Sequence, residues 1–149
     1  MATQAKTWRS LMNALASSHR APSATRTQTT AYWITTGIVV FCMTGGIFEL
    51  LSLPMTVDGI VKLGYPSYIV PALGLGKVLA ILAILSPGLP RLKEWAYAGI
   101  FFNMAGAFVS HIAHRDPMWS VVVTAVIGAI TLASWALRPA SRKLGGKTA

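Results

Sequence analysis

Long apolar runs alternate with short polar connections along most of the chain. Four runs are apolar enough to cross a bilayer, which takes about 20 residues in a helix; they cover residues 31–53, 68–85, 95–113 and 118–137. The connections are short, and too few residues remain outside the runs to build a separate soluble core. The pattern therefore predicts an all-α integral membrane protein whose residues 31–137 form a bundle of four transmembrane helices.

The chain on either side of the predicted bundle is polar. Residues 1–30 are rich in Ala, Ser and Thr and contain no acidic residue. Four of their apolar residues have the helical spacing i, i+3, i+4 and i+7, namely Trp8, Leu11, Met12 and Leu15. This spacing predicts a short amphipathic helix on the inner membrane surface beside Lys6 and Arg9, followed by disordered chain from Ser17 to Thr30. Residues 138–149 are expected to be a basic tail.

The formal net charge of +9 follows the predicted topology. Ten basic residues precede the first span, connect the second to the third, or follow the fourth: Lys6, Arg9, Arg20, Arg26, Arg91, Lys93, Arg138, Arg142, Lys143 and Lys147. The other two connections contain only Lys62 and Arg115. This is the positive-inside pattern, so both termini are predicted to be cytoplasmic. Basic residues distributed in this way argue against a nucleic-acid partner and for the lipid bilayer.

Two opposite charges, Glu49 and Lys77, lie inside the first and second predicted spans. On insertion scales a charge at the centre of a spanning helix costs roughly 2.5–3.5 kcal/mol, so such a residue suggests a functional site. Side chains lean toward the N-terminus of their helix, and the two predicted helices run in opposite directions, so Glu49 and Lys77 should converge in depth. Asn103 and His111 of the third span bracket the same outer half of the bundle. These four residues are the candidate site.

The sequence offers little for a resident redox or metal centre. Cys42 is the one thiol, which excludes an internal disulfide or dithiol chemistry. His111 and His114 lie at the end of the same span, so they do not supply a haem site across two helices. Together with Asp116 they form only a loosely spaced set of metal ligands. We therefore predict no metal and no covalently bound cofactor.

Two interpretations of the charged pair remain open. Glu49 and Lys77 could form a structural clasp that fixes helix order and register. Alternatively they could line a polar pocket in which the carboxylate takes a proton and the ammonium polarises a carbonyl of a lipophilic substrate.

A set of short motifs runs through the chain between residues 32 and 139. They comprise residues 63–66 (LGYP), Tyr68, Pro71, Gly74 and Lys77, then residues 90–99 (PRLKEWAYAG), and later Ser110 and His111. Together they resemble the DoxX-like family of small four-helix membrane proteins. The resemblance implies a bacterial inner-membrane protein, an accessory or quinone-contacting subunit of a redox complex. Electron transfer would then need a quinone and a partner subunit that carries flavin, haem or metal.

Two functions of other classes stay open. One is a small proton-coupled transporter, since four-helix transporters with a glutamate in the first span are known; the charge asymmetry favours a parallel homo-oligomer for it. The other is a structural assembly factor that binds no ligand and uses the ion pair as its clasp.

Overall fold

The computed structural model describes residues 2–18 and 25–144, and within α1 the side chains of residues 4 and 6–13. These residues are largely helical, with no strand among them. The helices are α1 (Ala2–Ser18), α2 (Arg26–Met43), α3 (Gly46–Leu50), α4 (Pro54–Lys62), α5 (Ile69–Leu85), α6 (Pro90–Ala113) and α7 (Met118–Leu137), followed by the 3₁₀ turn η1 (Ala140–Arg142). The expected all-α class is confirmed.

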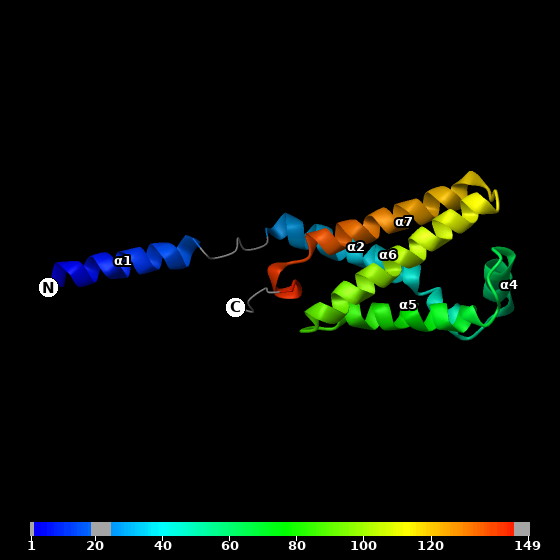
Figure 1. Cartoon of the computed structure of the whole chain (residues 1–149), viewed down its shortest axis with the longest axis horizontal. Coiled ribbons are helices and arrows are strands. Elements are labelled where there is room, and N and C mark those ends of the chain that lie inside the picture. Colours follow the sequence, from blue (N-terminus) through cyan, green and yellow to red (C-terminus); the bar gives the residue numbers. More distant parts are fainter. Residues whose placement is uncertain (1, 19–24, 145–149) are drawn as a thin grey trace.

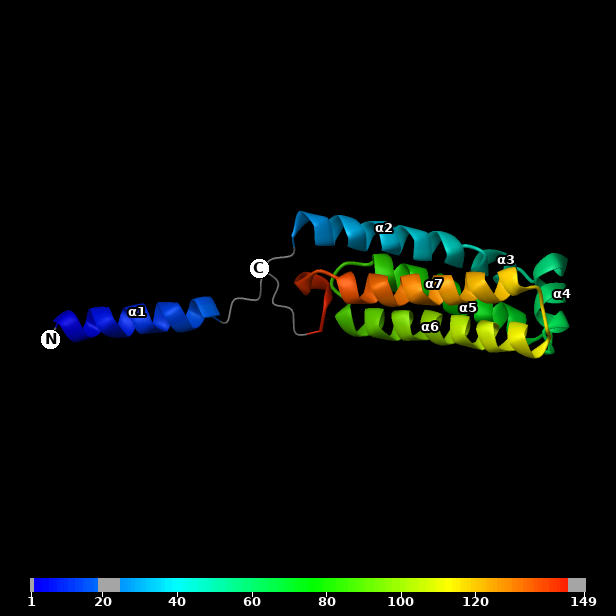
Figure 2. The same ribbon diagram turned by 90° about the horizontal axis from the view of Figure 1, so that it is seen from above.

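The helices α2 to α7 form an elongated bundle, and α1 stands apart from it (Figure 1, Figure 2). Around the bundle, α2 packs on α7, α7 on α6, α6 on α5, and α5 on α3. The short helix α3 continues the path of α2 after a turn at Thr44 and Gly45. Helix α4 lies across one end of the bundle (Figure 1), which we call the α4 end. The opposite end, where α6 begins and α7 ends, is called the basic end.

Three helical segments are long and apolar enough to cross a membrane: Arg26–Leu50, Pro90–Ala113 and Met118–Leu137. Helix α5 is also apolar but has 17 residues. Arg26–Leu50 and Pro90–Ala113 each begin five residues before the corresponding predicted span, whereas Met118–Leu137 has the predicted bounds. At the first, the Thr25 hydroxyl caps the helix by accepting a hydrogen bond from the Gln28 N–H at 3.2 Å, so the polar residues 26–30 are helical. Disorder is predicted from Ser17 to Thr30, but residues 17–18 and 26–30 are helical, and residues 19–24 lie outside the described residues.

Apolar side chains fill the centre of the bundle and also cover its outside. The buried cluster comprises Val39, Met43, Ala80, Ala83, Ile84, Ala96, Tyr97, Ile100 and Met104. Large side chains on the outer surface are just as apolar, for example Phe41 at 77%, Phe102 at 70% and Val109 at 63% exposure. Apolar surface on this scale marks a face that meets lipid or another protein.

Candidate functional site

Two glycines bring α3 and α5 into backbone contact. A Cβ atom on Gly74 would lie 2.3 Å from the Leu50 nitrogen, and one on Gly46 would lie 2.5 Å from the Lys77 Cβ. Small residues let helices approach this closely. Because Glu49 and Lys77 each follow their glycine by three residues, one helical turn, the glycine contact places the two charges beside each other.

Lys77 and Glu49 form a direct ion pair across this contact. The Lys77 ammonium donates to Glu49 Oε1. The two side chains are 16% and 12% exposed. The second carboxylate oxygen, Glu49 Oε2, is buried and has no hydrogen-bond partner among the described residues. The pair therefore retains an unused acceptor.

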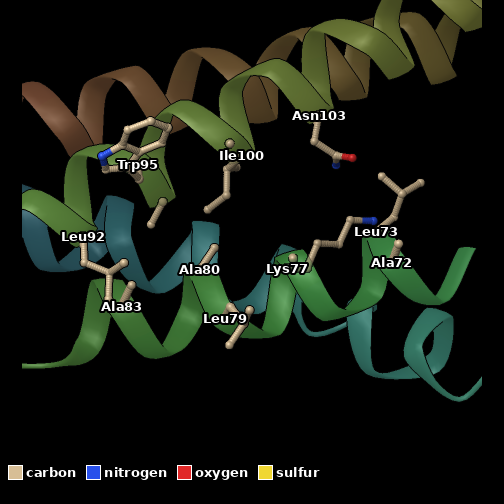
Figure 3. Close-up of a pocket in the computed structure, with 13 residues that line it drawn as sticks. Ala72, Leu73, Lys77, Leu79, Ala80, Ala83, Leu92, Trp95, Ile100 and Asn103 are labelled. Atoms are coloured by element: carbon tan, nitrogen blue, oxygen red, sulfur yellow. The ribbon is translucent and has the colours of Figure 1, made fainter. Parts of the chain in front are cut away.

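A cavity of about 340 Å³ lies between α5 and α6 (Figure 3). Its walls are mainly alanine, glycine and larger apolar side chains: Ala72, Leu73, Gly76, Leu79, Ala80, Ala83, Leu92, Trp95, Ala96, Gly99 and Ile100. Its polar lining residues are Lys77 and Asn103. Because the lining residues Leu79, Leu92 and Trp95 are exposed, the cavity lies at the outer surface of the bundle. We call it the lateral cavity.

A second cavity, of about 310 Å³, lies toward the α4 end. Its lining includes Ile60 of α4, together with Leu63 and Tyr65 of the loop that follows α4. It also includes Glu49, Lys77 and Asn103. We call it the α4 cavity. Leu73, Lys77 and Asn103 line both cavities, so the ammonium and the amide stand at their boundary.

Asn103 faces Lys77 from the opposite helix. Figure 3 shows its amide pointing from α6 toward the Lys77 ammonium across the lateral cavity. The side chain is half-buried, and it forms no hydrogen bond with any residue that the structure describes. The amide can therefore offer both a donor and an acceptor to a molecule in either cavity.

His111 lies away from the other three candidate residues. Its Nδ1 atom is 2.6 Å from Asp116 Oδ2, and it lines neither of the two cavities. The reason is helix geometry, since eight residues separate His111 from Asn103, about 12 Å along the axis of α6. The depth in the membrane that is expected from the sequence puts both residues in the same half of the bundle, but it does not resolve their separation along α6. Among the described residues no group of three possible metal ligands is present.

Tyr65 is a contributor to the α4 cavity that the sequence did not single out as a site residue. Its hydroxyl oxygen is 2.7 Å from the Ser110 Oγ atom. Ser110 in turn donates to the Gly106 carbonyl at 2.9 Å. This contact ties the loop after α4 to α6, so it holds the wall of the cavity in place. The sequence shows the motif at residues 63–66, but no feature of the neighbouring residues predicts that the Tyr65 side chain contacts α6.

The basic end contains a second group of buried charges. Lys93 is 1% exposed and donates to the carbonyls of Ser86 and, at 3.1 Å, Ala83. Arg138 is 2% exposed, and its Nη2 donates to Glu94 Oε1 at 2.6 Å. The sequence pattern identifies these bases as markers of topology, whereas in the structure both are buried at the end of the bundle.

A family model for the DoxX-like family matches residues 33–134, more than half of the chain. The chain belongs to the DoxX-like family. The match begins within α2 and ends within α7, so in this DoxX-like protein it includes Glu49, Lys77 and Asn103 and leaves Arg138 outside. No curated protein and no solved structure gives a match.

Proposed function

We propose that this DoxX-like protein crosses a bacterial inner membrane four times, with the basic end in the cytoplasm. Three segments have the length and composition of spanning helices. Helix α5, packed between α3 and α6, supplies the fourth crossing, since its 17 residues reach about 26 Å and a bilayer core is about 30 Å thick. The asymmetry of basic residues between the two ends supports the orientation.

We infer that the protein binds a lipophilic molecule with a carbonyl-bearing headgroup, such as a quinone, and serves as an accessory membrane subunit of a redox complex. The observation that supports this most directly is the position of Lys77 and Asn103 at the boundary of two otherwise mainly apolar cavities. Apolar cavities with a few convergent polar groups are typical ligand sites. The lateral cavity would take the hydrocarbon part of the ligand from the bilayer.

The polar groups suit such a headgroup. The Lys77 ammonium and the Asn103 amide would donate hydrogen bonds to carbonyl oxygens, and Glu49 Oε2 would accept one from a hydroxyl. These residues bind and orient; electrons would have to reach the ligand from a partner subunit with its own redox group.

A specific observation favours a second candidate, an assembly factor with no ligand. The backbones of α3 and α5 meet at Gly46 and Gly74, and an ion pair beside that contact would hold the two helices together without any ligand. Proton-coupled transport has less support, because the apolar cluster that includes Val39, Met43 and Ile100 lies in the bundle between Glu49 and the basic end.

The ligand hypothesis is tested by filling the lateral cavity. Cβ atoms on Gly76 and Gly99 would meet no atom within 4 Å, and both residues line the cavity. In nanodiscs, Gly99→Leu and Gly76→Leu should weaken binding of a short-chain ubiquinone analogue about tenfold or more, a loss of about 1.4 kcal/mol or more.

The matched control is Gly37→Leu, at an exposed glycine of α2 that is equally unobstructed and lies outside both cavities. Binding unchanged in the cavity variants, or lost equally in the control, would refute the site. Lys77→Met should also weaken binding, and Lys62→Met, at an exposed lysine outside both cavities, should not.

A further inference from the structure

Helix α1 is amphipathic and its apolar face is uncovered. Trp8, Leu11 and Met12 are 64%, 49% and 66% exposed. At 100° per residue they fall within an arc of about 100°, with Lys6, Ser10 and Asn13 on the opposite side. Figures 1 and 2 show α1 well away from the bundle. An apolar face of this kind needs a partner.

Length and position restrict that partner. The 17 residues of α1 reach about 26 Å and carry polar side chains along a whole face, so the helix does not itself span a bilayer. Seven residues, 19–25, connect it to the start of α2. Even fully extended they reach about 25 Å, which keeps the end of α1 near the basic end of the bundle.

Charge identifies the partner's chemistry. Helix α1 contains Lys6 and Arg9 and no acidic residue. Arg9 is on the border between the two faces, where its aliphatic stem can lie along an apolar surface while the guanidinium reaches a phosphate. Trp8 is the residue type that prefers the membrane–water interface. A surface that offers both hydrocarbon and negative charge fits all of these features.

We propose that α1 lies in the plane of the membrane at the basic end of the bundle and binds anionic phospholipids. Trp8, Leu11 and Met12 enter the boundary between headgroups and acyl chains, and Lys6 and Arg9 bind lipid phosphates. The helix thus gives the bundle a preference for anionic lipid that does not depend on the cavities.

Spin labels test the proposal on the full chain. In a Cys42→Ala background, single cysteines replace Leu11 or Met12 on the apolar face, and Ser10 or Asn13 on the polar face. In nanodiscs of phosphatidylcholine with phosphatidylglycerol, labels at 11 and 12 should be several-fold more accessible to oxygen than to a water-soluble nickel chelate. Labels at 10 and 13 should show the reverse. In phosphatidylcholine alone the difference should disappear.

Charge reversal separates the anionic contribution. Lys6→Glu with Arg9→Glu should expose the labels at 11 and 12 to the nickel chelate even in anionic nanodiscs. The control, Lys62→Glu with Arg91→Glu, makes the same change of net charge at exposed residues outside α1 and should leave them protected. Protection that is equal on both faces would indicate a protein contact, and a shift to dimers would identify a second copy. Either result, or equal protection in both lipids, overturns the proposal.

Discussion

The two ends of the bundle use the same kinds of charged groups in opposite ways. At the basic end, Lys93 and Arg142 donate to carbonyls at the C-terminal end of α5, those of Ala83, Ile84 and Ser86. These carbonyls have no partner within their own helix and carry its negative dipole, so cations stabilise them. The cations at the basic end therefore satisfy backbone carbonyls that the helix leaves without partners.

Arg138 is enclosed in the same way. It donates to Glu94 and to the Trp135 carbonyl, and its guanidinium carbon lies 5.1 Å from the centre of the Tyr97 ring. Its Nη1 atom has no hydrogen bond among the described residues, but the aromatic ring offers a cation–π contact.

At the α4 end, in contrast, Glu49 keeps an unused acceptor and Lys77 faces two cavities. Each end therefore has a buried polar atom without a hydrogen bond, but Glu49 lines the α4 cavity and Arg138 lines neither cavity. A free polar atom beside a cavity indicates binding, whereas one packed against an aromatic ring indicates a structural role.

The basic end should give the largest loss of stability. Arg138→Met would leave Glu94 with one partner fewer at a site where the arginine is 2% exposed. Glu94 is 27% exposed and keeps its bond from Trp135, so the loss is that of a hydrogen bond between charged groups, about 1.5–3 kcal/mol, together with the contact of the arginine with the Tyr97 ring. Thermal unfolding in detergent, followed by circular dichroism, should show this as a large fall in midpoint temperature. Arg91→Met, at an exposed arginine of the same helix as Glu94, should change it little; similar falls would contradict the assignment.

The glycine contact is expected to be the next most sensitive point. Gly74→Ala would force a Cβ against the Leu50 nitrogen at 2.3 Å, so α3 and α5 must separate. Overpacking of this kind costs typically about 1–3 kcal/mol. Gly76→Ala, on the same helix with no atom within 4 Å, should instead be neutral or stabilising, since alanine favours helix over glycine by about 1 kcal/mol. Equal effects on the unfolding midpoint would mean that the contact does not position the pair.

The ion pair itself should be less costly to break, because the adjoining cavities can admit water to an unpaired group. Lys77→Met should destabilise the bundle by about 1–2 kcal/mol, within the range for an unsatisfied polar group. The double variant Glu49→Gln with Lys77→Met should recover most of that loss in the same unfolding assay. A double variant that folds well but no longer binds the quinone analogue would support the ligand site over the clasp.

The sequence predicted the helical class because apolar runs of bilayer length leave few other folds. It also predicted that Glu49 and Lys77 should converge, because helix direction and side-chain lean depend only on local geometry. It did not predict that Gly46 and Gly74 bring α3 and α5 into contact, because that contact depends on the turn at Thr44 and Gly45, which a continuous apolar run does not reveal. It did not foresee the packed charges at the basic end, because burial of Lys93 and Arg138 depends on how three helix ends meet.

The smallest expected effect concerns the wall of the α4 cavity. Tyr65→Phe removes the hydroxyl that bonds Ser110 Oγ, and one such hydrogen bond contributes about 0.5–1.5 kcal/mol. Because Tyr65 lines the α4 cavity, the loosened loop should raise the dissociation rate of the quinone analogue in stopped-flow measurements, with little change in unfolding temperature. Tyr68→Phe is the matched control, since Tyr68 is 78% exposed and lines neither cavity. If Tyr65→Phe lowers stability as much as Gly74→Ala does, the loop is part of the packed scaffold. The α4 end would then have a structural role, as the basic end does.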